Sequence, residues 1–147
     1  MKTRIAFLLA MVLGAPAWGD MAVTDPWARA SILASRPGAA YLTIESTEHD
    51  RLIEISTPIA TKVMIHETEI GTDGVSRMRH IHALELPEGQ VVSLSPGNMH
   101  LMLMGIESKL VEGTSFPMTL IFEKAGEVVV EFQVFGSTAT GPEGTGQ

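Results

Sequence analysis

The sequence contains no cysteine. This absence excludes disulfide bridges, thiolate metal ligands, cysteine nucleophiles and dithiol redox chemistry. The sequence also lacks an apolar run of the roughly 20 residues that are needed to span a bilayer. Its longest such run, residues 5–13, has only nine. We therefore expect no permanent membrane anchor, and any soft metal must be bound by side chains other than cysteine.

The first 19 residues have the pattern of a secretory signal peptide. Lys2 and Arg4 supply a positive start, and the apolar run follows them. Ala15-Pro-Ala17 and Gly19 then supply small residues for cleavage. We predict that residues 1–19 are a signal peptide and that the remainder of the chain is exported.

Basic residues are scarce once the predicted signal peptide is removed. Lys2 and Arg4 account for 2 of the 10 basic residues, so 8 remain against 17 acidic ones, a net charge of −9 with histidine neutral. A protein with this excess of negative charge repels phosphate groups. We therefore expect neither nucleic acid nor anionic lipid as a partner.

Beyond residue 20 the sequence predicts a single domain built from β-strands. Short runs of apolar and β-branched residues alternate with turn residues, and no longer stretch carries a helical stripe. Asp73-Gly74, Ala125-Gly126 and Pro96-Gly97-Asn98 are typical turn sequences. The predicted strands are Ala39–Ser46, Leu52–Ser56, Lys62–Glu69, Val75–Leu86, Val91–Leu94, Met99–Met104, Phe116–Glu123 and Glu127–Phe135.

These strands favour an all-β fold, either a β-sandwich or a small barrel, with meander or Greek-key connections. We place the domain at residues 20–136. Residues 137–147 are mostly Gly, Ser, Thr and other residues with nothing to bury. We predict that they form a disordered tail.

Methionine and histidine are concentrated in one part of the chain. Thioether sulfur is a soft ligand and imidazole a borderline one, so a mixed site without thiolates favours Cu(I) over zinc or iron. Magnesium and calcium prefer oxygen ligands, which this cluster does not offer. The residues concerned are His66, His80, His82 and His100 with Met64, Met78, Met99, Met102 and Met104.

Strand alternation brings several of these side chains together, because every second residue of a strand lies on the same face. The sets that share a face of their predicted strand are His100, Met102 and Met104 on one strand and Met78, His80 and His82 on another. His66 lies on the strand that precedes the second set, across the Asp73-Gly74 turn. Ligands from three segments can therefore converge on one metal site.

Two other interpretations stay open on composition and spacing. Methionine commonly fills gaps in a protein core, so the cluster is also compatible with a structural β-domain. A metal held by His66 and His100 beside Glu67 would instead activate water, which would make the protein a copper-dependent enzyme. The methionines that we assign to the core are Met64, Met99 and Met118.

A series of motifs then points to a known family. The motifs are Asp25-Pro-Trp-Ala-Arg29, Pro37-Gly-Ala-Ala-Tyr-Leu-Thr-Ile44, His66-Glu-Thr68, Asp73-Gly-Val75, Pro96-Gly97 and His100-Leu-Met-Leu-Met-Gly105. The chain from Asp25 to Phe135 resembles the PCu(A)C family of periplasmic copper chaperones, whose signature is His-x10-Met-x21-His-x-Met. Met78 and His100 have 21 residues between them, and His100-Leu101-Met102 matches the His-x-Met end of the signature.

His66 departs from the signature by one position, because 11 residues separate it from Met78. The simplest interpretation places the extra residue in the loop between Glu69 and Gly74, where it leaves the strand register intact. A shift of register would instead turn His66 to the opposite face of the sheet.

The resemblance implies a cupredoxin-like Greek-key β-barrel that holds Cu(I) and delivers it to a copper enzyme, typically cytochrome c oxidase. It implies a chaperone of the bacterial periplasm rather than an enzyme. Its partners would be the copper ion and a copper-receiving protein, either a cytochrome c oxidase subunit or another copper chaperone. A blue-copper electron carrier would need a cysteine ligand, which this chain lacks. The ligands that the resemblance implies are His66, Met78, His100 and Met102.

His80 and His82 lie outside this implied ligand set. One interpretation is that they occupy an exposed strand face without a role in metal binding. The other is a second site, beside Met78, that recruits Cu(II).

Overall fold

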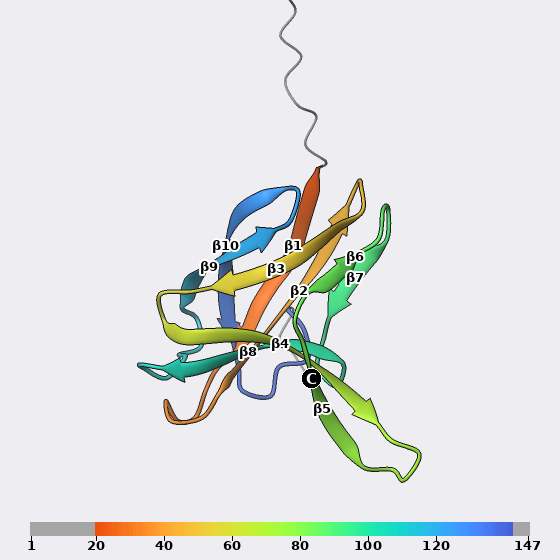
Figure 1. The fold of residues 1–147 in the computed structure, drawn as a ribbon. Coiled ribbons are helices and arrows are strands. Elements are labelled where there is room, and N and C mark those ends of the chain that lie inside the picture. Colours follow the sequence, from red (N-terminus) through yellow and green to blue (C-terminus); the bar gives the residue numbers. More distant parts are fainter. Residues whose placement is uncertain (1–19, 143–147) are drawn as a thin grey trace, which may run out of the picture.

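The computed structural model describes residues 20–142, and it contains ten strands and no helix in that range. The predicted all-β fold is confirmed (Figure 1). The predicted signal peptide, residues 1–19, lies outside the described residues. Over residues 20–142 there is no helix with the length and apolar character to cross a membrane. The strands are β1 (Met21–Arg29), β2 (Gly38–Ser46), β3 (Asp50–Ser56), β4 (Ala60–Ile70), β5 (Ser76–Ile81), β6 (Leu84–Leu86), β7 (Val91–Leu94), β8 (Met99–Ile106), β9 (Ser115–Phe122) and β10 (Gly126–Phe135).

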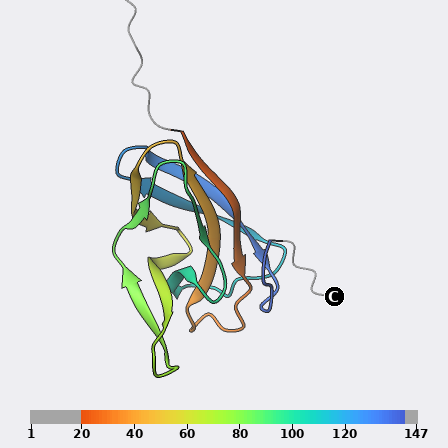
Figure 2. The same cartoon turned by 90° about the vertical axis from the view of Figure 1, so that its right-hand side faces the viewer.

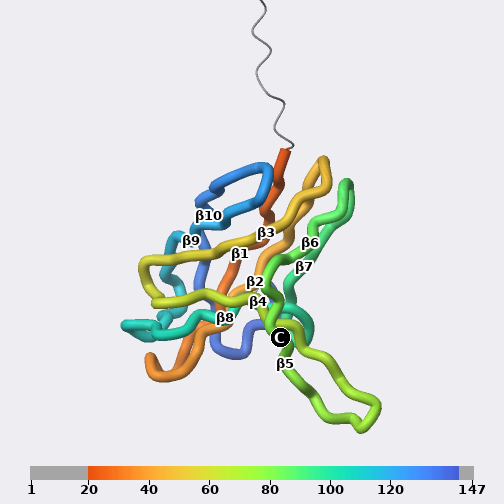
Figure 3. Tube along the Cα trace, in the orientation of Figure 1, coloured from red at the N-terminus to blue at the C-terminus, as the bar shows by residue number. Residues whose placement is uncertain are grey.

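The strands form one curled sheet in the order β5-β4-β8-β2-β1-β10-β9-β3-β6, and β7 pairs with β2. Neighbouring strands are antiparallel except β1 and β10, which are parallel. Although β3 and β4 lie far apart in this order, they contact each other (Figures 1 and 3). The sheet therefore curls around one apolar core, as a barrel does. The most buried core side chains include Leu42, Ile44, Leu52, Leu101, Leu103, Met118, Leu120, Phe122 and Phe132.

Strand β1 is an element that the sequence pattern does not predict. It pairs with both β2 and β10, but its register shifts by one residue between Thr24 and Trp27. Asp25 adopts a left-handed backbone with φ of 51° at this bulge, and Pro26 follows it. A bulge with a proline breaks the alternation by which a strand is recognised in a sequence.

The prediction of one strand over Val75–Leu86 is wrong. The chain forms β5, which pairs with β4, and then β6, which pairs with β3. His82 and Ala83 lie between the two strands and pair with neither neighbour. The two halves of the predicted strand thus belong to opposite ends of the sheet order, and the chain must bend to reach both. His82 therefore does not follow Met78 and His80 along one strand.

The β4–β5 hairpin projects from the body of the sheet (Figures 1 and 2). Its tip is the predicted Asp73-Gly74 turn, where Gly74 has a φ of 74°. The Asp73 carboxylate accepts a hydrogen bond from the Val75 amide at 3.1 Å and pairs with the Arg77 guanidinium at 2.6 Å. These contacts order the turn that brings β5 back along β4.

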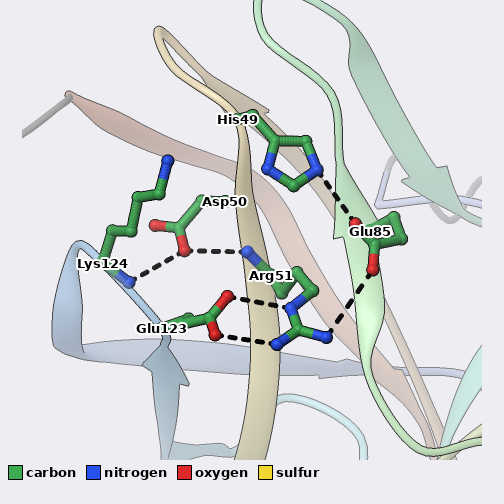
Figure 4. Close-up of polar contacts among 6 residues, drawn as sticks. All are labelled: His49, Asp50, Arg51, Glu85, Glu123 and Lys124. Atoms are coloured by element: carbon green, nitrogen blue, oxygen red, sulfur yellow. Dashed lines mark hydrogen bonds and ion pairs between the residues drawn. The ribbon is translucent and has the colours of Figure 1, made fainter.

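Buried Asp50 joins β3 to the turn between β9 and β10 (Figure 4). Its carboxylate accepts backbone hydrogen bonds from Arg51 at 2.7 Å and from Lys124 and Ala125 at 2.9 Å each. The side chain of Asp50 is only 1% exposed, so these bonds replace its contacts with water. Asp50 therefore fixes the predicted Ala125-Gly126 turn to the start of the neighbouring strand β3.

The surface above Asp50 carries a chain of ion pairs (Figure 4). The Arg51 guanidinium pairs with Glu123 at 2.7 Å and lies 3.9 Å from Glu85. His49 Nε2 lies 3.0 Å from Glu85. Exposed pairs of this kind contribute little individually, so we assign them to surface electrostatics rather than to function.

The predicted disordered tail lies partly within the described residues. Ala139 accepts a hydrogen bond on its carbonyl from Nε of Arg29 at 2.8 Å, and its amide donates to the Gly136 carbonyl at 3.0 Å. Residues 143–147 lie outside the described residues. Disorder over 137–147 stays a prediction.

Candidate metal centre

The histidines and methionines of β5, β4 and β8, except Met99, share one face of the sheet. Residues that are directly opposite in neighbouring strands project to the same side. His66 on β4 is opposite His80 on β5 and His100 on β8. Met78 is opposite Thr68, two residues beyond His66 and therefore on the same face. The pairing of three strands thus gathers side chains that are separated by more than thirty residues in the sequence.

The longer spacing between His66 and Met78 does not separate them. Met78 pairs with Thr68 and His80 pairs with His66, so both β5 residues lie on the His66 face. This register agrees with the expectation that the extra residue leaves His66 on the same face as the other implied ligands.

Three of the four implied ligands surround one shallow hollow of about 360 Å³. Met78, His100 and Met102 line it together with Thr68 and the start of β2. Met78 is 62% exposed, whereas His100 and Met102 are partly buried. The hollow therefore offers two thioethers and one imidazole in a place that solvent and another protein can reach. The remaining residues that line it are Pro37, Gly38, Ala39, Tyr41 and Gly97.

His66 lies beside this hollow rather than in its lining. Its ring centroid is 5.8 Å from that of His100 and 5.7 Å from that of His80. Its Nδ1 atom is buried and has no hydrogen-bond partner among the described residues. A buried polar nitrogen without a partner is costly, and such an atom at a cluster of soft ligands fits a metal ligand.

The donor atoms that this face offers to a metal ion include the thioether sulfurs of Met78 and Met102. No group of three or more His, Asp or Glu side chains within residues 20–142 is arranged to hold a metal ion. The thioethers of Met78 and Met102 are the softest donors beside His100. A soft univalent ion therefore suits this hollow better than a zinc or calcium ion does.

Burial lowers the pKa of His100, and the nearby ring of His66 lowers it further. A hydrogen bond with the Asn98 backbone raises it in part. The net downward shift favours the neutral imidazole, which is the form that binds a metal. The pKa of His80 is also lowered, first by partial desolvation and then by the neighbouring charges of His82, His66 and Lys62.

Glu67 lies on the opposite face of β4 from His66, because the two residues are adjacent in one strand. Its carboxylate pairs with the guanidinium of Arg79, which also pairs with Glu69 at 2.9 Å. These contacts hold Glu67 away from the face that carries His66 and His100. The arrangement gives no support to the interpretation of Glu67 as a base that activates metal-bound water.

The wall that β2 contributes is a feature that sequence reasoning misses. Gly38 packs so closely that a Cβ atom there would lie 2.8 Å from Cδ1 of Ile106. The small residues Gly38, Ala39 and Ala40 let β2 approach β8, with which all three pair. The run of small residues in the sequence indicates that another strand packs closely against this segment. It does not indicate that the strand is β8.

Among the methionines assigned to the core, Met118 is fully buried and Met99 packs against the core. Met64 differs, because it is only partly buried and lies opposite Met102 on the histidine face. Met64 therefore belongs to the surroundings of the site rather than to the main core.

Comparison with known proteins places the chain in a family. A family model described as "Putative lipoprotein LpqE-like" matches residues 21–134. The uncharacterised protein RP573 of Rickettsia prowazekii is 29% identical over 125 residues, which cover 81% of this chain and 68% of RP573.

Two solved proteins show the same fold. The PCuAC domain of PmoF2 in its apo form has a TM-score of 0.70 and 29% identity, covering 85% of this chain and 97% of that domain. Its copper-bound form has a TM-score of 0.68 and 28% identity, with coverages of 82% and 96%. CuI-DR1885 from Deinococcus radiodurans has a TM-score of 0.59 and 25% identity, with coverages of 84% and 81%.

The predicted resemblance and the cupredoxin-like all-β fold are confirmed by these matches. The similarity extends over nearly the whole described domain, including the three strands that carry the histidines and methionines. The chain therefore belongs to the LpqE-like family and has the fold of PCuAC domains.

Proposed function

We propose that this protein is a copper metallochaperone that holds Cu(I) through Met78, His100 and Met102, with His66 as the fourth ligand. The observation that carries the proposal is the hollow in which the first three side chains meet. Two solved relatives with the same fold are described as copper-bound and CuI-bound, which supports copper as the cargo.

The donor set suits a carrier. Neutral thioethers need no deprotonation to bind Cu(I), and they release it more readily than thiolates do. The site is open on the side of Met78, so a ligand from an acceptor could replace one methionine at a time. Holding the ion among partly buried residues while leaving one ligand exposed favours transfer over permanent storage.

We propose that the acceptor is a copper-receiving protein in the periplasm, such as a cytochrome c oxidase subunit or another copper chaperone. The predicted signal peptide and the family's description as a lipoprotein both support export. The 147 residues contain no cysteine to carry a lipid. We infer a non-enzymatic role, because soft thioether ligands favour a bound Cu(I) ion over turnover and because Glu67 lies on the opposite face of β4 from His66.

An anaerobic Cu(I) titration against a competing chelator tests the ligand set directly. We expect one Cu(I) per chain, and replacement of Met78, His100, Met102 or His66 by alanine should each lower the affinity about tenfold or more. Met99→Leu is the matched control, because Met99 lies in the same strand as Met102 but packs against the core. Equal affinities for Met102→Leu and Met99→Leu would overturn the assignment of Met102.

A further inference from the structure

We propose that His80 and His82 form a second metal site, outside the Cu(I) hollow, that binds Cu(II) through two imidazoles. The two rings have centroids only 4.4 Å apart, although His82 lies beyond the end of β5. Both side chains are exposed, so an ion reaches them without any movement of the protein. The bend after Ile81 therefore leaves the two rings side by side even though His82 is not part of β5.

The two histidines open onto a hollow of their own. A cavity of about 450 Å³ lies between β3 and β4, and His80 and His82 line one end of it. It shares no lining residue with the hollow around Met78 and His100. The two hollows therefore have separate linings, and they meet where the ring of His80 lies 5.7 Å from that of His66.

The cavity exists because two strand edges face each other without pairing. β5 pairs with β4 only from Ile65 onward, and β6 pairs with β3 only as far as Leu52. The stretch of β4 before Ile65 and the stretch of β3 after Leu52 therefore leave a slot, and the chain that links β5 to β6 crosses its end. His80 is the second-last residue of β5 and His82 is the first residue of the link, and both line the slot.

The ligand chemistry of this pair differs from that of the hollow. Imidazole is a borderline ligand that suits Cu(II), whereas the thioethers of the hollow suit Cu(I). Met64 also lines the slot, but no third His, Asp or Glu joins the pair in a metal-binding arrangement within the described residues. Solvent would complete the coordination, so we expect a weaker and more rapidly exchanging site than the one around His100.

Lys62 provides an internal check on the proposal. It lines the same slot, and its positive charge acts on His80. A cation bound between His80 and His82 would be repelled by this charge. If the pair binds Cu(II), then Lys62→Gln should strengthen the binding, whereas a nonspecific copper-binding surface elsewhere would not respond to Lys62.

The test is Cu(II) binding to the full exported chain, followed by chelator competition and electron paramagnetic resonance. We expect His80→Ala/His82→Ala to weaken Cu(II) binding about tenfold or more and to remove nitrogen couplings from the spectrum. Lys62→Gln should strengthen binding by about twofold or more. His49→Ala is the control, because His49 is an exposed histidine that contacts Glu85 and does not line the slot.

The outcomes separate this proposal from the proposed Cu(I) function. Unchanged Cu(II) affinity and spectrum in the double variant would overturn the second site, and so would an equal loss in His49→Ala. Anaerobic Cu(I) affinity is measured on the same double variant and should fall by less than the roughly tenfold expected for replacement of a Cu(I) ligand, although the ring of His80 lies only 5.7 Å from that of His66. If the starting protein does not bind Cu(I), the proposed function is wrong. The second site is then still decided by the Cu(II) affinity and spectrum of the double variant.

Discussion

His66 and His100 lie opposite each other on β4 and β8, with ring centroids 5.8 Å apart and rings inclined at 75°. Nδ1 of His66 is buried without a hydrogen-bond partner among the described residues. A group of this kind lowers the stability of the protein unless another atom binds it. If His66 is the fourth ligand, as proposed above, binding of Cu(I) at this position should also stabilise the protein.

The first prediction concerns His66→Leu. Leucine removes the unpaired nitrogen and keeps an apolar volume, so the metal-free variant should be as stable as the starting protein or more stable by about 1 kcal/mol. Its Cu(I) affinity should fall about tenfold or more. Urea denaturation of the metal-free proteins and chelator competition measure the two effects. If the metal-free His66→Leu variant is clearly less stable than the starting protein, the imidazole of His66 stabilises the fold by itself, and this explanation is wrong.

The second prediction concerns pH. An ordinary histidine, with a pKa near 6.5, is half protonated at that pH. Because the pKa of His100 is lowered, protons compete with copper for His100 only at lower pH. Cu(I) affinity should therefore change little between pH 8 and about pH 6.5 and should fall at lower pH. Affinity that is flat down to pH 5 would argue against histidine ligation. A steep fall already between pH 8 and 7 would contradict the lowered pKa.

The strands that carry the site are predictable in part. The run Val91–Leu94 matches β7, and the turn at Asp73-Gly74 places β4 beside β5. Alternation along Met99–Met104 also predicts that His100 and Met102 share a face. These features are local, because each depends on residues that are close together in the sequence.

The contacts between distant strands could not be predicted in the same way. The pairing of β4 with β8 sets His66 beside His100, and neither strand carries a local signal for that register. The split between β5 and β6 arises because one chain segment pairs with two different partners. This split places His82 beyond the end of β5, with its ring still 4.4 Å from that of His80. Long-range pairing is therefore what assembles both candidate sites.

The third prediction concerns Gly105, which follows Met104 near the end of β8. Its φ is 63°, and a Cβ atom there would lie 2.2 Å from Oγ1 of Thr61. Gly105→Ala should therefore lose about 2 kcal/mol or more of stability. Adding Thr61→Ala removes the clash but not the left-handed backbone, so the double variant should recover part of the loss. Equal stabilities for the single and double variants in urea denaturation would contradict this explanation.

The fourth prediction concerns acid stability and Asp50. Burial by itself would raise the pKa of Asp50, but hydrogen bonds from the backbone of Ala125, Lys124 and Arg51 outweigh burial and hold the pKa below its usual value. A carboxylate with a lowered folded-state pKa stabilises the protein above its unfolded-state pKa of about 3.9, and this contribution disappears as the pH falls through the folded-state value. Stability should thus decrease below about pH 4.

Asp50→Asn isolates that contribution. The amide offers one acceptor oxygen where the carboxylate offers two, so the variant should lose about 1–3 kcal/mol at pH 7. The difference between the two proteins should shrink as the pH falls toward about 3, because the unfolded starting protein then binds a proton at Asp50 that the folded protein resists. Urea denaturation at pH 7, 5 and 3.5 measures the trend. A difference that stays constant over this range would mean that Asp50 stabilises the turn through its shape alone and that its charge contributes nothing.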